Sequence, residues 1–192
     1  SGRTKLRLVH SDGSKELAKA CRMHGVPQET SLPNDPQGNG LAESMVRVEK
    51  DGCRCDLTQS GHPACFWPFG VVHFAFARNI QQRNGEGSSP YEKKFHEGVF
   101  PGDRVPFGAA IQFRQQPAIE KGKQHPTMGS VMVPGVFLGW KQHPGGKWAK
   151  GYIVADLREY VGMDLRVGGK IKTQVVDRIE FDPGDIRFPL KA

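Results

Sequence analysis

Long apolar runs are missing from this sequence of 192 residues. No stretch approaches the roughly 18–20 consecutive apolar residues that a helix needs to cross a bilayer. The first twelve residues, SGRTKLRLVHSD, also lack the apolar core of a secretory signal peptide. These two absences disfavour a transmembrane or a secreted protein.

Cysteine is scarce, and the four residues present are Cys21, Cys53, Cys55 and Cys65. Cys53 and Cys55 lack the two intervening residues usual in zinc sites, and His62 stands too close to Cys65 for a standard zinc finger. We therefore expect buried or incidental thiols and no zinc. Because no export signal is present, unpaired thiols suit a reducing compartment.

Internal repeats and low-complexity tracts are absent as well. The content of 37% hydrophobic and 24% charged residues describes an ordinary globular chain. Its length allows one full domain or two small ones. Glycine (24 residues) and proline (14 residues) are frequent for a helical bundle, which predicts many turns and a β-rich part.

Positive charge exceeds negative charge, with 27 Lys and Arg against 20 Asp and Glu, a net charge of +7. The sequence pI is about 9.4. This balance favours an anionic partner, with nucleic acid first among the candidates. The alternative is that the charge serves solubility alone, since it is spread along the chain rather than gathered in a tail.

The first hundred residues are predicted to alternate short strands and helices. Residues 5–10 alternate basic and apolar side chains, which is typical of a half-buried strand, and residues 26–32 can form a second strand. We expect helices over residues 15–24, from Asn39 onward, over residues 66–80 and near residues 90–97. The side chains predicted to be buried are Leu17, Ala20, Cys21 and His24 in the first of these helices, Leu41, Met45 and Val48 in the second, and Trp67, Val71, Phe74 and Ala75 in the third. Because a strand that begins almost at residue 1 needs partner strands, we expect a fragment of a larger domain.

After Gly102 the pattern changes to short β-like runs separated by glycine and proline. The runs are residues 109–113, 133–140, 148–155 and 172–179. Residues 143–147 have the composition of a hairpin turn, and residues 115–129 are the best candidate for a mobile loop. We predict a mixed α/β chain, α+β overall, with one domain over residues 1–100 and a small β-rich, barrel-like domain over residues 101–192.

Two carboxylates lie where active sites usually form in α/β sheets, at the ends of strands and the starts of the following helices. Asp12 follows the first predicted strand, and Glu43 lies near the start of the helix after an Asn/Pro/Gly-rich loop. Brought together, two such groups could hold a divalent metal for phosphoryl transfer. The alternative is an Asp in a turn and a Glu near a helix N-terminus, where carboxylates are favoured for structural reasons. The spacing alone favours this alternative.

A series of motifs around these carboxylates favours the metal-binding interpretation over the structural one. The first two read His10-Ser11-Asp12-Gly13 and Pro36-Gln37-Gly38-Asn39-Gly40-Leu41-Ala42-Glu43. The later ones are Gly61-His62-Pro63, Phe66-Trp67, Asn79, Ser89-Pro90-Tyr91-Glu92, Phe107-Gly108 and Gly135-Val136-Phe137-Leu138-Gly139-Trp140. In this order they closely resemble the integrase of copia-type (Pseudoviridae) retrotransposons, from His10 to about Asp182.

The resemblance implies a truncated ribonuclease-H-like catalytic core, part of a Pol polyprotein, followed by the small β domain. The family's active site uses two aspartates and one glutamate around Mg²⁺ or Mn²⁺, and Asp12 matches the second aspartate and Glu43 the glutamate. The first aspartate lies on an earlier strand that this chain does not match. Only 30 residues separate Asp12 from Glu43, fewer than is usual in the family. We therefore expect the isolated chain to be inactive, because metal geometry tolerates only small displacements.

DNA is the partner that the resemblance implies, together with an integrase homo-oligomer and no membrane. The location implied is intracellular, in the nucleus or in a cytoplasmic virus-like particle. Arg47 and Lys50 follow Glu43 at i+4 and i+7 and are expected to contact phosphates, as are Asn39 and Gln37. The alternatives are an ordinary ion pair between Glu43 and Arg47, and capping or turn roles for Asn39 and Gln37.

Two other functions stay open beside an integrase that carries out DNA integration. One is a non-catalytic nucleic-acid-binding relic that kept the fold after losing its active site. The other is a structural module that docks another protein through its β part. Salt-dependent DNA binding separates these two, because phosphate contacts release counterions.

Overall fold

A computed structural model describes residues 6–11, 13–30, 40–81, 87–114, 132–165 and 171–191. The chain forms two compact units, Ser1–Val48 and Glu49–Ala192. The predicted sites Asp12, Gln37 and Asn39 and the predicted loop over residues 115–129 lie outside the described residues. The described helices include none that is both long and apolar enough to cross a membrane.

The first unit contains a strand, a helix and a second strand in succession. They are β1 (Val9–Ser11), α1 (Lys15–Met23) and β2 (Gln28–Thr30), and the two strands pair in parallel. Ser14 caps α1, its hydroxyl accepting a hydrogen bond from the backbone N–H of Leu17 at 3.4 Å. The predicted strand, helix and strand are confirmed, with shorter strands than expected.

The predicted buried stripes of this region are wrong. In α1 only Cys21 is buried. In α2 (Gly40–Ser60), Leu41, Met45 and Val48 are 81%, 42% and 38% exposed. The physical reason is that two strands of three residues and one short helix offer too little apolar surface to cover a helix face.

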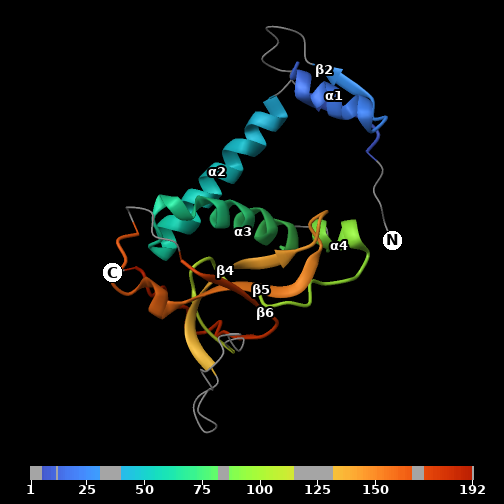
Figure 1. The fold of residues 1–192 in the computed structure, drawn as a ribbon. Coiled ribbons are helices and arrows are strands. Elements are labelled where there is room, and N and C mark those ends of the chain that lie inside the picture. The colour runs from blue at the N-terminus through green and yellow to red at the C-terminus, as the bar shows by residue number, and fades with distance from the viewer. Residues whose placement is uncertain are drawn as a thin grey trace, which may run out of the picture. The chain divides into compact units, whose positions relative to one another are not determined.

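The second unit begins within α2 and places helices beside an antiparallel sheet. The helices are η1 (Ala64–Phe66), α3 (Trp67–Ile80), α4 (Pro90–Phe95) and η2 (Leu157–Tyr160). The strands are β3 (Ala110–Arg114), β4 (Met132–Gln142), β5 (Trp148–Asp156), β6 (Thr173–Val176) and β7 (Ile179–Glu180). Figure 1 shows α3 alongside β4. The predicted α+β fold class is confirmed, while the division at residue 100 stays a prediction.

The five strands lie in the order β6-β5-β4-β3-β7, and every pairing is antiparallel. β6 and β7 occupy opposite edges although Val176 and Ile179 are only three residues apart. Three residues span at most about 10 Å, whereas the edges of a flat five-stranded sheet lie about 19 Å apart. The sheet is therefore strongly rolled, as expected for a small barrel-like domain. The predicted hairpin turn is also confirmed, since His143 donates its backbone N–H to the Lys147 carbonyl at 2.8 Å.

Side chains of β4 and β5 form two hydrophobic clusters. Phe137 belongs to one cluster and Leu138 to the other, as strand alternation requires. A register shift between Phe137 and Gly139 then returns Trp140 to the cluster of Phe137. This β-bulge places the Trp140 ring against Phe76 of α3, with the ring centroids 5.1 Å apart.

The buried face of α3 differs from the predicted one. Gly70, His73, Phe76 and Ile80 are buried, whereas Trp67 is 61% exposed. Gly70 faces α2, where a β-carbon would stand only 2.9 Å from Cys53 Sγ. Gly70 and His73 therefore belong to the packed face of α3 although neither has an apolar side chain. A search for periodic apolar residues does not detect such positions.

Candidate functional site

Glu43 lies in the first turn of α2, where the helix dipole favours a carboxylate. Arg47 and Lys50 follow on the same helix, and all three residues are exposed. Their spacing places them on one helical face. Within the described part of the chain none of the three has an ion pair, so the alternative of a Glu43–Arg47 pair is not seen here. The face continues to Arg54, which sequence reasoning missed and which donates to Asp51 at 2.7 Å.

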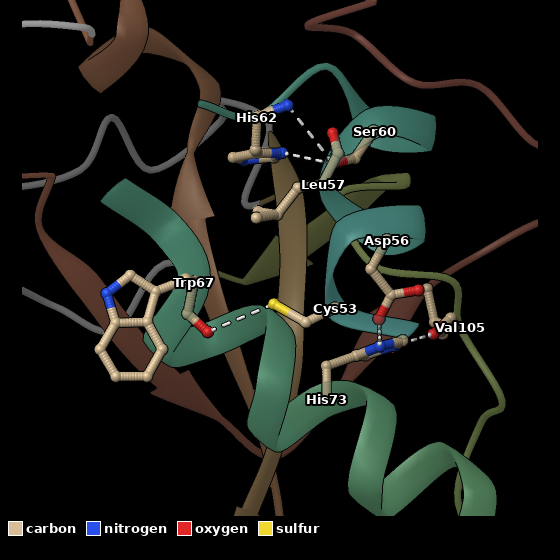
Figure 2. Close-up of polar contacts among 8 residues, drawn as sticks. All are labelled: Cys53, Asp56, Leu57, Ser60, His62, Trp67, His73 and Val105. Atoms are coloured by element: carbon tan, nitrogen blue, oxygen red, sulfur yellow. Dashed lines mark hydrogen bonds and ion pairs between the residues drawn. The ribbon is translucent and has the colours of Figure 1, made fainter. Parts of the chain in front are cut away.

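Between α2 and α3, two polar contacts join the helices. The Asp56 carboxylate lies 2.7 Å from Nδ1 of His73, and Arg78 donates to Glu49 Oε1 at 3.3 Å. Nε2 of His73 lies 3.1 Å from the Val105 carbonyl oxygen (Figure 2). Both ring nitrogens of His73 thus face oxygen atoms, one of a carboxylate and one of a backbone carbonyl.

A cavity of about 310 Å³ opens beside this contact. Its apolar walls include Phe74, Ile80 and Trp140, and its polar lining includes Asp56, Gln59, His73, Arg78, Gln81 and Arg104. Sequence reasoning missed this group because its members come from three separated segments. Asp56 and His73, for example, stand 17 residues apart on different helices, and no local spacing signals such a pair.

A second buried histidine, His62, joins the end of α2 to η2. Ser60 donates its hydroxyl hydrogen to the Leu57 carbonyl at 3.1 Å, so its oxygen accepts from His62 Nδ1 at 3.0 Å (Figure 2). Nε2 then accepts from the Tyr160 hydroxyl, which lies 3.2 Å away. Burial lowers the pKa of His62 to about 4 and raises the pKa of Tyr160. Because Ser60, His62 and Tyr160 are all buried, this chain of hydrogen bonds is structural and offers no access to a substrate.

The cysteines occupy two kinds of environment. Cys21 and Cys53 are buried, while Cys55 and Cys65 are exposed, and none forms a disulfide. Burial, with a smaller contribution from Asp56, raises the pKa of the Cys53 thiol, whose sulfur lies 3.6 Å from the Trp67 carbonyl oxygen (Figure 2). A raised pKa makes a thiol unreactive. The described residues include no group of three or more His, Cys, Asp and Glu side chains placed to hold a metal.

Comparison with known proteins gives one informative similarity. No family model matches the chain. The chain is 26% identical over 142 residues to the "Retrovirus-related Pol polyprotein from transposon TNT 1-94" of Nicotiana tabacum. The match covers 71% of this chain and 10% of the tobacco protein, so the chain spans about a tenth of that relative's length. By sequence, therefore, the chain is similar to a region of a retrotransposon Pol polyprotein.

Proposed function

We propose that the chain is part of a copia-type integrase, and that it binds DNA during DNA integration. The observation that carries the proposal is the exposed face of α2, where Glu43 stands beside Arg47 and Lys50 in a chain similar to a retroelement polyprotein. The parallel β1–α1–β2 unit supports a ribonuclease-H-like core, which is built from such units. A homo-oligomer of integrase chains and an intracellular location belong to the same proposal.

The metal part of the proposal depends on two carboxylates. Glu43 is a suitable ligand, because it is exposed and forms no ion pair with the described residues. Asp12, the other carboxylate, lies outside the described residues. Glu43 by itself does not hold a metal. Mg²⁺ or Mn²⁺ in the complete site would activate a hydroxyl and stabilise the leaving oxygen.

DNA binding by this chain requires neither the metal nor the first aspartate of the family's active site. Arg47 and Lys50 can contact successive phosphates along one helical face, because guanidinium and ammonium groups bind phosphate through charge-assisted hydrogen bonds. The short interval between Asp12 and Glu43 favours a second candidate, a non-catalytic nucleic-acid-binding relic. The two candidates differ in catalysis and share the DNA-binding face.

Strand transfer by a longer Pol fragment, extended upstream to include the first aspartate, separates the two candidates. With Mn²⁺ we expect no strand transfer from the isolated chain and measurable transfer from the extended chain. Replacing Glu43→Gln should lower that transfer by about 100-fold or more, because it removes a charged metal ligand. Glu180→Gln, an exposed carboxylate in β7, is the matched control and should leave transfer unchanged. If the extended chain shows no strand transfer with either Mg²⁺ or Mn²⁺, the integrase proposal is contradicted and the non-catalytic nucleic-acid-binding relic remains.

A further inference from the structure

The cavity between α2, α3 and the segment before β3 has unused polar groups at its surface. Among the described residues, the side chains of Gln59, Gln81 and Arg104 form no hydrogen bond or ion pair, and all three are exposed. Arg78 contacts Glu49 through one nitrogen, and a guanidinium has five N–H donors. Four polar side chains with free hydrogen-bonding capacity therefore line one cavity.

One of the two arginines that line the cavity has no carboxylate partner among the described residues. Asp56 is occupied by His73, and Glu49 is occupied by Arg78 through Oε1. Glu49 Oε2 is buried and has no hydrogen-bond partner among the described residues, so this acceptor lacks a donor. Arg104 has no carboxylate partner in the described part of the chain. The exposed and unpaired guanidinium of Arg104 is therefore the group that can bind an anion at the mouth of the cavity.

Apolar side chains line part of the cavity. Phe74 and Pro106 are half-buried and supply apolar surface, while Ile80 is buried. The Trp140 ring is fixed, because it stacks on His73 at 5.0 Å and donates its Nε1–H to the Asp103 carbonyl at 3.0 Å. The volume of about 310 Å³ lies at the small end of the range for ligand pockets, about 300–1,000 Å³. A cavity of this volume can hold one ring system with one anionic group.

We propose that this cavity binds a single unpaired nucleotide of the DNA. Its base lies against the apolar walls, with its polar edge on the amides of Gln59 and Gln81, and its phosphate lies on Arg78 and Arg104. Glutamine amides pair with the N6 and N7 edge of adenine, and base stacking is a sequence-tolerant source of affinity. This inference rests on the proposed DNA binding and adds a site separate from the α2 face.

Three DNA probes test the site in equilibrium binding to the whole chain: a fully paired duplex, the same duplex with one unpaired deoxyadenosine, and the same duplex with an abasic residue at that place. We expect the unpaired base to strengthen binding about tenfold over the paired duplex, and the abasic probe to lose that gain. Gln81→Ala and Arg104→Ala should abolish the preference while binding the paired duplex within about twofold of the unchanged chain. Gln112→Ala and Arg187→Ala, exposed residues that do not line the cavity, should retain the preference.

The outcomes separate this site from the proposed function. Equal affinity for the three probes would overturn the nucleotide site and leave DNA binding in place. A preference that survives both Gln81→Ala and Arg104→Ala, in variants with unchanged melting temperature, would also overturn it. No binding to any of the three probes would overturn both proposals.

Discussion

His62 and His73 are both buried, and they meet different kinds of hydrogen-bond partner. His62 has one donor partner, the Tyr160 hydroxyl, and one acceptor partner, the Ser60 oxygen, so a neutral ring satisfies both. His73 faces a carboxylate and a carbonyl oxygen, which both accept. Its ring is also stacked on Trp140, with an angle of 15° between the planes. The first histidine therefore stabilises the fold as a neutral group, and the second links Asp56 of α2 to the Val105 carbonyl.

Acid should destabilise the protein through His62. Its pKa falls from 6.5 in the unfolded chain to about 4 in the folded protein, so folding favours the neutral ring. The stabilisation is fully present above pH 6.5 and is lost as the pH falls toward 4, a change of about 3 kcal/mol in the free energy of unfolding. Urea unfolding across this pH range measures the change. Glutamine does not titrate, so the His62→Gln variant should lack the decrease in the free energy of unfolding between pH 6.5 and pH 4 that His62 causes. An identical pH dependence in both proteins would contradict the assignment.

At the scale of secondary-structure elements, the turn before β3 fits tightly against the end of α2. Gly108 has φ 70°, and a β-carbon there would stand 2.4 Å from Ser60 Cβ and 2.9 Å from the His62 ring. Its backbone N–H donates to the Phe137 carbonyl at 2.7 Å, which fixes the turn on β4. The left-handed conformation and the close approach both require glycine at this position.

Gly108→Ala should lower the free energy of unfolding by about 3 kcal/mol or more, because strain in the backbone adds to a steric clash. Gly145→Ala is the matched control. It also has a positive φ, 95°, but a β-carbon there meets no atom within 4 Å. The control should therefore cost only about 1 kcal/mol, from conformation alone. Chemical denaturation gives both values, and equal costs would show that the contact with Ser60 carries no energy.

Sequence patterns predicted the elements of this chain better than their buried faces. The strands over residues 109–113, 133–140 and 148–155 and the hairpin at residues 143–147 follow from local alternation and turn chemistry, and the structure confirms them. The predicted run over residues 172–179 is wrong as a single strand, because the chain divides there into β6 and β7, which lie at opposite edges of the rolled sheet. The stripes of α2 and α3 were wrong because burial depends on which partner covers a helix. Glu43, Arg47 and Lys50 were placed correctly on one exposed helix. The cavity with Arg104 was missed, because it assembles residues that are remote in sequence.

At the scale of the whole molecule, the net charge of +7 has two proposed uses. The α2 face offers cations to the DNA backbone, and the cavity offers Arg78 and Arg104 to one phosphate. Other basic residues are already neutralised by neighbours; Arg158 and Arg187, for example, pair with Asp156 and Asp185. Because these other arginines are already paired, mutations in the α2 face and in the cavity can test the two basic sites one at a time.

The salt dependence of duplex DNA binding tests the DNA-binding claim most directly. Each phosphate contact releases counterions and contributes about 0.9 to the slope of log K against log salt. We predict that Arg47→Ala and Lys50→Ala each make this slope shallower by about 1 between about 50 and 200 mM salt. Arg187→Ala, in which an exposed guanidinium paired with Asp185 is removed, should leave the slope unchanged. A slope near zero for the unchanged chain, or equal slopes for all four proteins, would contradict DNA binding through the α2 face.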